Sequence, residues 1–280
     1  MNLRITLSVL LLVFLTLVAG AEIPERQTGT LLAATFNIRR LSDRSRNDEE
    51  LEAICRVLSI FDFIAIQEAL ETDILDRAVR MLYNRYGMSY AYVASDAVGR
   101  GGYYEIYAFL YRSDQVSFEG TSALIPDPLD YFIRQPFYAN FLSDNFDFYA
   151  ISTHVVYGKS RKDRLQEAIL LDDVFDYVWE LDEENDVLLM GDFNLRPDDE
   201  HLRELRGRAG LVYLNEEPTT LGENIYDNIW LNEEFTSELM ESGVLLFDEE
   251  FFNNDDTAAK NAVSDHRPLW VRFNTAADDD

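Results

Sequence analysis

The chain has 280 residues, and 47% of them are hydrophobic, which is ample for burying a core. Its formal charge of −28 argues against nucleic-acid binding by the surface as a whole, because phosphates would be repelled. Cys55 is the only cysteine in the sequence, which excludes an intramolecular disulfide.

The first 21 residues have the pattern of a secretory signal peptide. Arg4 precedes an apolar run from Leu7 to Val18, and small residues at 19–21 supply a cleavage site. The run is short for a membrane-spanning helix, although an uncleaved anchor is the alternative. We expect residues 1–21 to be removed. Residues 22–280 are then expected to form a single monomeric domain, secreted or periplasmic, without stable membrane association.

Strands and amphipathic helices alternate along the rest of the chain. Runs of apolar, aromatic and β-branched residues predict strands at 31–38, 63–66, 90–94, 106–111, 146–155, 186–190, 226–231, 244–247 and 269–273. Apolar stripes at helical spacing predict helices at 48–58, 72–86 and 160–181, and Gly87 ends the second. Successive strands mixed with strand–helix units predict an α/β fold, with mixed sheets covered by helices.

Polar side chains of the kinds that catalyse reactions or bind metals follow several of these strands. They are Asn37, Glu68, His154, Asp192, Asn194, Asp227, Asp265 and His266. Each position alone is explained as well by an ordinary turn. Two of the three histidines in the chain fall in this set, however, whereas His201 lies on a polar segment and is not expected to belong. The ends of separate strands can converge on one rim, where ligands bind in layered α/β folds.

The residue types in this set favour one kind of chemistry. The carboxylate oxygens of Glu68, Asp192 and Asp265 suit Mg²⁺, Mn²⁺ or Ca²⁺, and scattered histidines with a single cysteine argue against a structural zinc site. A histidine oriented by a carboxylate can act as an acid or a base. The sequence contains neither a Gly-x-Ser-x-Gly elbow nor a Walker loop. We therefore expect metal-assisted attack of water on phosphorus.

Six sequence blocks occur in a recognisable order. They are TFNIR, IAIQEAL, STHV, LLMGDFN, IYDNIWL and SDHRPLWV. From Leu31 to Phe273 the chain resembles the endonuclease/exonuclease/phosphatase superfamily, and within it secreted deoxyribonuclease I. The resemblance implies a four-layer α/β sandwich with two packed mixed β-sheets flanked by helices. It also implies a DNA endonuclease that uses Mg²⁺ or Mn²⁺, with Ca²⁺ as a further possibility.

The resemblance assigns metal binding to Glu68 as the principal ligand, supported by Asn37 and Asp265. It implies catalytic roles for six further residues, namely His154, His266, Asp192, Asp227, Glu105 and Asn194. Two acid–base pairs are expected among them, His154 with Glu105 and His266 with Asp227. Which histidine is the acid and which the base is left open. Asp192 and Asn194 are expected to bind or orient the phosphate, the water or a second metal.

The resemblance also implies substrate contacts. GRGGYYEIYAFLYRSDQV resembles the tyrosine-x-glutamate strand of the family, which places Tyr103 against nucleic acid. FIRQPFYANF resembles the arginine block, which puts Arg134 beside the scissile phosphate. Two basic segments, 39–46 and 159–164, leave the proposed rim. We expect them to form a basic lip on an acidic body, with substrate contacts from Arg39, Arg40 and Lys159.

Some features depart from the pancreatic members or leave alternatives open. The disulfides of those members cannot form here, and Asn228 follows Asp227 where they carry a basic residue, which weakens the match to duplex DNA. A phosphatase and a lipid (sphingomyelin-type) phosphodiesterase are alternatives within the superfamily. The lipid enzyme would need an exposed apolar hairpin, for which 131–133 and 137–138 are candidates, although core packing explains them better. A non-catalytic binding module on the same scaffold is a third alternative.

Overall fold

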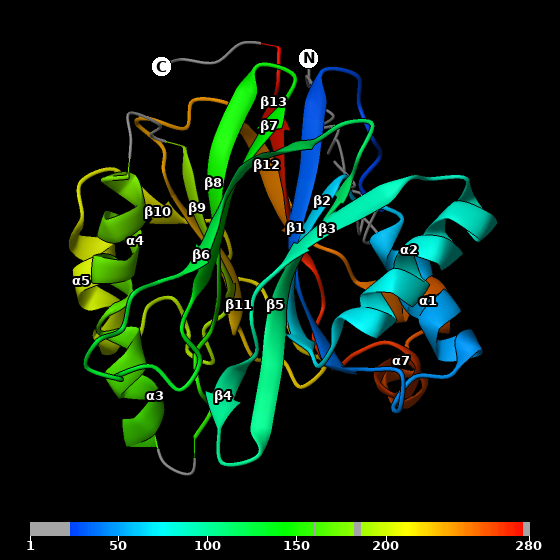
Figure 1. Cartoon of the computed structure of the whole chain (residues 1–280), viewed down its shortest axis with the longest axis horizontal. Coiled ribbons are helices and arrows are strands. Elements are labelled where there is room, and N and C mark those ends of the chain that lie inside the picture. The colour runs from blue at the N-terminus through cyan, green and yellow to red at the C-terminus, as the bar shows by residue number, and fades with distance from the viewer. Residues whose placement is uncertain (1–22, 159–160, 182–185, 277–280) are drawn as a thin grey trace, which may run out of the picture.

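Successive residues of the central strands are buried on alternate faces, which requires a packed layer on each side of the sheet. In β1 (Thr30–Leu41), Ala33 belongs to the core between the two sheets, whereas Ala34 belongs to the core beneath helices. The computed structural model describes residues 23–158, 161–181 and 186–276, and two mixed sheets lie face to face in it (Figure 1).

The other elements follow in chain order. They are α1 (Asp48–Leu58), β2 (Phe63–Ala69), α2 (Thr72–Tyr86), β3 (Tyr90–Ala94), β4 (Val98–Arg100), β5 (Tyr103–Arg112), β6 (Ser117–Leu124), β7 (Phe137–Ser143), β8 (Phe146–His154), α3 (Arg161–Ala168), α4 (Leu171–Trp179), β9 (Val187–Asp192), the 3₁₀ turn η1 (Glu200–Leu202), α5 (Arg203–Gly207), β10 (Leu211–Tyr213), β11 (Asp227–Asn232), β12 (Leu239–Val244), α6 (Phe247–Phe252), α7 (Asp256–Ala262) and β13 (Leu269–Asn274).

The strand order explains how distant segments meet. The first sheet runs β12-β13-β1-β2-β5-β3, with β4 paired to β5, and β1 and β2 are parallel. The second sheet runs β10-β11-β9-β8-β7-β6, with β8 and β9 parallel. The other strand pairs of both sheets are antiparallel. The carboxyl ends of β1 and β2 therefore share one edge, and those of β8 and β9 share another.

Three hydrophobic cores separate four layers. Leu51 of α1 and Leu75 of α2 pack on the outer face of the first sheet. Phe63 and Phe148 belong to the core between the sheets, where their rings lie 5.3 Å apart in an edge-to-face contact. Phe175 of α4 packs on the outer face of the second sheet, and Figure 1 shows α4 lying along that sheet. The predicted four-layer sandwich is confirmed. No helix among the described residues is both long and apolar enough to cross a membrane.

The first two predicted helices are confirmed in their bounds, although the N-cap of α2 is Glu71, which makes no side-chain capping hydrogen bond. Asn47 caps α1, because its side chain accepts from the backbone N–H of Glu49 and Glu50, while Glu50 accepts from the Asn47 N–H. Gly87 ends α2 in the left-handed conformation, with φ 67°.

The single helix predicted at 160–181 is wrong within the described residues. Two helices, α3 and α4, replace it, because the Leu170 N–H bonds to Glu167 O and closes a tighter turn. The two helices also face different partners, since α4 packs on the sheet while Glu167 of α3 contacts loops. The strand predicted at 244–247 is also displaced, because β12 ends at Val244 and Phe247 begins α6.

Candidate active site

The register of the second sheet places three of the predicted site residues abreast. His154 at the end of β8 pairs with Asp192 at the end of β9, and Asp227 at the start of β11 pairs with the same Asp192. Because β11 is antiparallel to β9, its first residue lies at the same edge as the last residue of β9. One aspartate therefore lies between a histidine and a second aspartate.

Gly191 lets β8 and β9 approach closely at this edge. Its φ is +149°, and a Cβ atom at this position would lie 1.9 Å from the carbonyl oxygen of Thr153. Beyond it, the Asn194 N–H donates to Asp192 Oδ1 at 2.8 Å, and Asn194 Nδ2 donates to Asp192 Oδ2 at 3.3 Å. Phe193 instead packs toward Trp230 in the outer core. The two polar residues of the GDFN block thus face one side and the aromatic residue the other, as the alternation of a strand predicts.

The first acid–base pair is His154 with Glu105, and both residues are buried. His154 Nδ1 lies 2.9 Å from Glu105 Oε1, while Arg134 Nε lies 3.1 Å from Glu105 Oε2. Arg134 also donates to the carbonyl oxygen of His154 at 3.1 Å. The arginine that was predicted to contact phosphate therefore also orients this pair. Tyr107, two residues after Glu105, fixes the backbone, since the His154 N–H donates to its hydroxyl at 3.0 Å.

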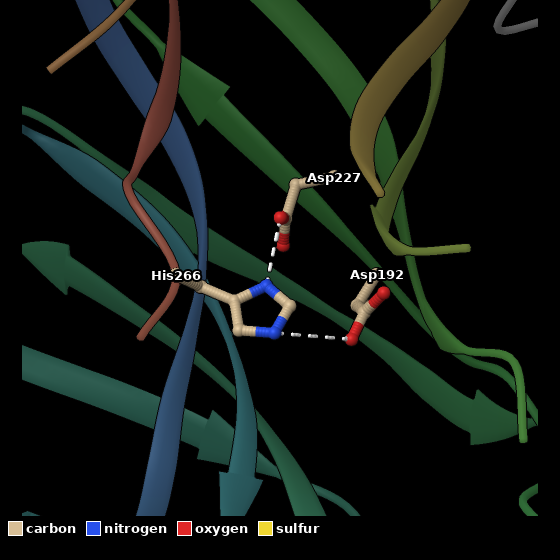
Figure 2. Close-up of side chains that lie close together, drawn as sticks. All are labelled: Asp192, Asp227 and His266. Carbon is tan, nitrogen blue, oxygen red and sulfur yellow. Dashed lines mark hydrogen bonds and ion pairs between the residues drawn. The ribbon is translucent and has the colours of Figure 1, made fainter. Parts of the chain in front are cut away.

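The second pair is His266 with Asp227 (Figure 2). Asp227 lies beside Asp192 in the second sheet, whereas His266 precedes β13 of the first sheet. His266 Nδ1 lies 2.8 Å from Asp227 Oδ2. The Asp227 N–H donates to Thr219 Oγ1 at 3.0 Å, which anchors the start of β11. Both histidines turn their other ring nitrogen toward one atom, since Asp192 Oδ2 lies 3.4 Å from His154 Nε2 and 3.8 Å from His266 Nε2.

Burial and nearby carboxylates act in opposite directions on both histidines. Burial lowers the pKa of His266, but Asp227 and Asp192 outweigh it and raise that pKa to about 10. Burial likewise lowers the pKa of His154, yet Glu105 raises it above its ordinary value despite the nearby Arg134. The cationic form of the His266 imidazole is therefore favoured near neutral pH, and that of His154 is stabilised relative to a free imidazole.

Glu68 and Asn37 lie beside the histidine pairs, Glu68 near the end of β2 and Asn37 within β1, at the residue after which the pairing of β1 with β2 shifts register. Asn37 Nδ2 lies 3.3 Å from Glu68 Oε1 and 3.1 Å from Asp192 Oδ2. Asn37 Oδ1 is buried and has no hydrogen-bond partner among the described residues. Glu68 has a left-handed backbone with φ 61°, as do Arg40 and Asn194, with φ 52° and 50°. Such non-glycine conformations cost about 1–3 kcal/mol each and gather at functional sites.

Asp265 is engaged by cations. Its Oδ2 lies 2.8 Å from Lys260 Nζ, and its Oδ1 lies 3.8 Å from Arg39 Nε. Burial raises the pKa of Asp265, but Lys260 and His266 outweigh it and hold that pKa below its ordinary value. A compact group of potential metal ligands forms instead from Asp192, Asp227 and His266, whose ligand atoms all lie within 4.8 Å of one another (Figure 2).

Two open cavities meet at His266. One has a volume of about 530 Å³ and is lined by Arg39, Arg40, Glu68, Tyr103, Arg134 and His266 among others. The other has a volume of about 560 Å³ and is lined by Asn194, Thr220, Tyr226, Lys260 and His266 among others. Tyr103 is 77% exposed, so it is free to contact a ligand. The structure thus brings together all the predicted site residues that it describes, whereas Lys159 and residues 1–21 lie outside the described residues.

The predicted basic lip requires a correction. Arg46 is buried and donates to the carbonyl oxygens of Asn261 and Val263, so it holds the chain together and does not face solvent. Arg164 donates to the carbonyl oxygens of Tyr157 and Asn194. A charge pattern in the sequence cannot distinguish an arginine that binds backbone carbonyls from one that faces a phosphate.

Sequence reasoning also missed residues that support the site. Tyr107 follows Glu105 at the strand spacing that places two side chains on one face, so alternation alone indicated it. Thr219 and Glu167 had no comparable signal in the sequence. Thr219 lies outside the strand that holds its partner Asp227, and Glu167 contacts Ile133 and Val156, which lie on other segments. Among the hairpin candidates, Phe132, Phe137 and Tyr138 are buried, as core packing predicted, and Tyr131 is exposed.

Comparison with known proteins identifies the class. Residues 34–266 match the model of the Endonuclease/Exonuclease/phosphatase family. A deoxyribonuclease from Thioalkalivibrio sp. is 32% identical over 90% of this chain and 73% of its own length. Deoxyribonuclease-1-like 2 from Mus musculus is 30% identical over 88% of this chain and 92% of its own length. The chain belongs to the Endonuclease/Exonuclease/phosphatase family, and it is a deoxyribonuclease-like hydrolase of phosphoester bonds.

Solved structures show the same fold at lower identity. Humanized D. rerio TDP2 superposes with a TM-score of 0.61 at 19% identity, covering 89% of this chain and 100% of that one. An endonuclease/exonuclease/phosphatase from Bacteroides vulgatus superposes with a TM-score of 0.61 at 16% identity, covering 87% of this chain and 98% of that one. At these identities the likeness concerns the fold and carries no information about the substrate.

Proposed function

We propose that this protein is a secreted or periplasmic endonuclease that hydrolyses the phosphodiester bonds of DNA with the help of a divalent cation. One observation carries the proposal: two carboxylate-oriented histidines approach Asp192 Oδ2, at 3.4 and 3.8 Å. Both separations exceed the usual N–H···O range, so neither Nε2 atom is committed to a protein hydrogen bond there. Both remain available for a phosphate oxygen or a water molecule.

The donor set fits a hard divalent cation. Glu68 supplies carboxylate oxygens, and the buried Asn37 Oδ1 has no protein partner in the described part of the chain. Asp192, Asp227 and His266 form the second group of ligand atoms. Glu68 and Asn37, with Asp265 in support, are the residues we propose for Mg²⁺ or Mn²⁺, and Ca²⁺ is also compatible with oxygen donors. When bound, the cation would polarise the phosphoryl oxygens.

The protein's own residues account for the proton transfers. Hydrolysis forms a bond from a water oxygen to phosphorus and breaks the bond from phosphorus to the leaving sugar oxygen. One histidine accepts the proton of the water, and the other donates a proton to the leaving oxygen. Glu105 and Asp227 hold their imidazoles by Nδ1, so that Nε2 exchanges the proton in each case. Asn37 and Asn194 hold Asp192 in place.

The cavity beside His266 supports an extended polyanionic substrate. Arg39, Arg40 and Arg134 line it together with Tyr103, so a strongly acidic protein presents cations and an exposed ring where phosphates would lie. The relatives named as deoxyribonucleases, at 32% and 30% identity, support DNA as the substrate. The apolar run at residues 7–18 supports export.

A substrate panel at fixed Mg²⁺ tests this proposal. Supercoiled plasmid, RNA, bis-p-nitrophenyl phosphate and sphingomyelin vesicles are incubated with the protein, with and without EDTA. We expect plasmid nicking that EDTA abolishes. Hydrolysis of sphingomyelin without any cleavage of nucleic acid would contradict the proposal and favour a lipid phosphodiesterase.

A further inference from the structure

Glu167 of α3 is a buried carboxylate that the proposed chemistry does not use. Glu167 is only 1% exposed. Oε1 accepts from the backbone N–H of Ile133 at 2.6 Å, and Oε2 accepts from the backbone N–H of Val156 at 2.7 Å. Ile133 directly precedes Arg134, and Val156 lies two residues after His154. One carboxylate therefore joins the two segments that carry Arg134 and His154.

The same two segments are joined again on the other side. Arg134 Nη1 donates to the carbonyl oxygen of His154 at 3.1 Å, and Arg134 Nε lies 3.1 Å from Glu105 Oε2. Glu105 in turn contacts His154 Nδ1 at 2.9 Å. Glu167, Arg134, Glu105 and His154 thus form a closed ring of polar contacts. In such a ring, a shift of one member changes the position of the others.

Arg164, one helical turn before Glu167, contacts one further segment, at Asn194, and also the residue that follows Val156. Its Nη1 donates to the carbonyl oxygen of Asn194 at 2.9 Å, and its Nε donates to that of Tyr157 at 3.3 Å. Its guanidinium also lies 4.0 Å from the centre of the Tyr157 ring. Arg164 therefore satisfies carbonyl oxygens while Glu167 satisfies N–H groups, and both kinds of contact are made to segments that carry or adjoin proposed site residues.

The composition of α3 agrees with a role in holding loops. Its sequence RKDRLQEA contains few apolar residues, and Ala168 is its only fully apolar residue that is buried among its described side chains. A helix with so little apolar surface gains little from core packing. Its polar side chains, by contrast, connect the ends of three site segments.

We propose that Glu167 is a positioning residue for the hydrolysis proposed above, and that α3 acts as a polar bracket for the site. The inference rests on the proposed function for its catalytic part. Glu167 fixes the distance between the Arg134 and His154 segments. Glu105 and Arg134 can then hold the His154 imidazole in the orientation that hydrolysis requires. A carboxylate is required, because each oxygen accepts one N–H. A glutamine amide would place its own N–H₂ against one of those donors.

The matched test compares Glu167→Gln with Asp62→Asn. Asp62 is also buried and accepts a backbone N–H, from Leu32 at 3.1 Å, but it precedes β2 at the end opposite Glu68. We expect Glu167→Gln to lower kcat by about 10- to 100-fold on bis-p-nitrophenyl phosphate, with KM changed less than about threefold, because misplacement acts on the reacting geometry. Asp62→Asn is expected to lower the Tm while kcat stays within about twofold of the wild type.

A second readout does not depend on activity. Amide hydrogen exchange is measured by mass spectrometry on the full chain, at a temperature where both variants are folded. Glu167→Gln is expected to accelerate exchange in the segments around Ile133 and Val156, and Asp62→Asn is expected to leave both segments unchanged.

These two measurements separate the possible failures. An unchanged kcat in Glu167→Gln, or an equal loss of kcat in Asp62→Asn, would overturn the positioning role. Unchanged exchange in both segments would overturn the bracket itself. If the wild-type protein hydrolyses no phosphoester, the proposed function fails, while accelerated exchange in Glu167→Gln would still support the bracket.

Discussion

Asn37 and Glu68 each destabilise the folded state locally, and core packing does not explain why such residues are present. Asn37 donates to Glu68 and Asp192, which leaves its buried Oδ1 without a partner in the described structure. An unsatisfied buried polar atom costs about 1–3 kcal/mol. Glu68 adds the cost of a left-handed backbone. Neighbouring features that each cost folding free energy are expected at a site where a bound ligand compensates for that cost.

Glu68→Gln tests the metal assignment. We expect the Mg²⁺ concentration for half-maximal hydrolysis to rise by at least about 10-fold, because one charged oxygen donor is lost. Glu71→Gln is the matched control, since Glu71 is an exposed carboxylate that accepts the Asp43 N–H at 2.8 Å. Titrations of activity and of Mn²⁺ binding give the answer, and a Mg²⁺ titration identical to that of the wild type would remove Glu68 from the metal site.

The His266–Asp227 pair predicts a pH dependence of stability in the metal-free protein. The folded pKa of His266 is about 10, above its ordinary value of about 6.5. A raised pKa means that the folded state binds the extra proton, so the stabilisation is complete below about pH 6.5 and is lost as the pH rises toward 10. His154 has the same direction of shift and adds to this trend.

Urea unfolding with EDTA between pH 6 and 10 measures this effect. The reference is the double variant His266→Gln with Asp227→Asn, which has no titrating group in the pair. We expect the free energy of unfolding of the wild type to fall relative to the double variant by up to about 3 kcal/mol between pH 6.5 and 9, since one pKa unit corresponds to about 1.4 kcal/mol. A difference that stays constant with pH would contradict the pairing.

At the scale of elements, Gly191 makes the parallel pairing of β8 and β9 possible next to the site. Gly191→Ala is expected to destabilise the fold by roughly 3 kcal/mol or more, because the new Cβ would lie 1.9 Å from Thr153 O. Gly207→Ala is the control, since a Cβ there would have no atom within 4 Å. Thermal unfolding compares the two variants, and an equal Tm for both would show that β8 and β9 tolerate the extra atom.

Several elements followed from the sequence because their signals are local. The apolar stripe of residues 48–58 indicated α1, and Gly87 indicated the end of α2. The single helix predicted at 160–181 failed at the turn that the Leu170 N–H closes onto Glu167 O, and the Glu167 side chain there contacts Ile133 and Val156 on other segments, for which a sequence carries no local signal. Strands β6 and β7 were missed for a related reason. β6 is the edge strand of the second sheet and β7 lies between β6 and β8, and only this tertiary pairing defines the two strands.

The site residues could be predicted from the sequence where they lie at the ends of strands. His154, Asp192 and Asp227 were expected there, and the register of β8, β9 and β11 brings them together. The pairing of each histidine with its carboxylate came from the resemblance. The polar bracket was not predictable, because a buried arginine or glutamate that binds backbone atoms has no pattern of its own in a sequence.

At the scale of the whole molecule, a formal charge of −28 coexists with cations around one cavity. Self-repulsion destabilises the compact state and is screened by salt, whereas attraction of DNA phosphates to Arg39 and Arg40 is weakened by salt. We therefore expect the Tm to rise between about 0.05 and 0.5 M NaCl while plasmid affinity falls, as followed by calorimetry and by a binding titration in Ca²⁺. A DNA affinity that does not change with salt would contradict the phosphate contacts.

The most direct test of the central claim is the rate of plasmid nicking in Mg²⁺ by the wild type, His154→Ala, His266→Ala and the double variant. His201→Ala serves as the control, since His201 pairs with Asp199 away from the site. Because the two histidines act on the same reaction step, we expect each single variant to lose about 10³- to 10⁴-fold and the double variant to lose little more. The control should keep the wild-type rate. Nicking that survives in His154→Ala and His266→Ala, in variants that remain folded, would contradict the account.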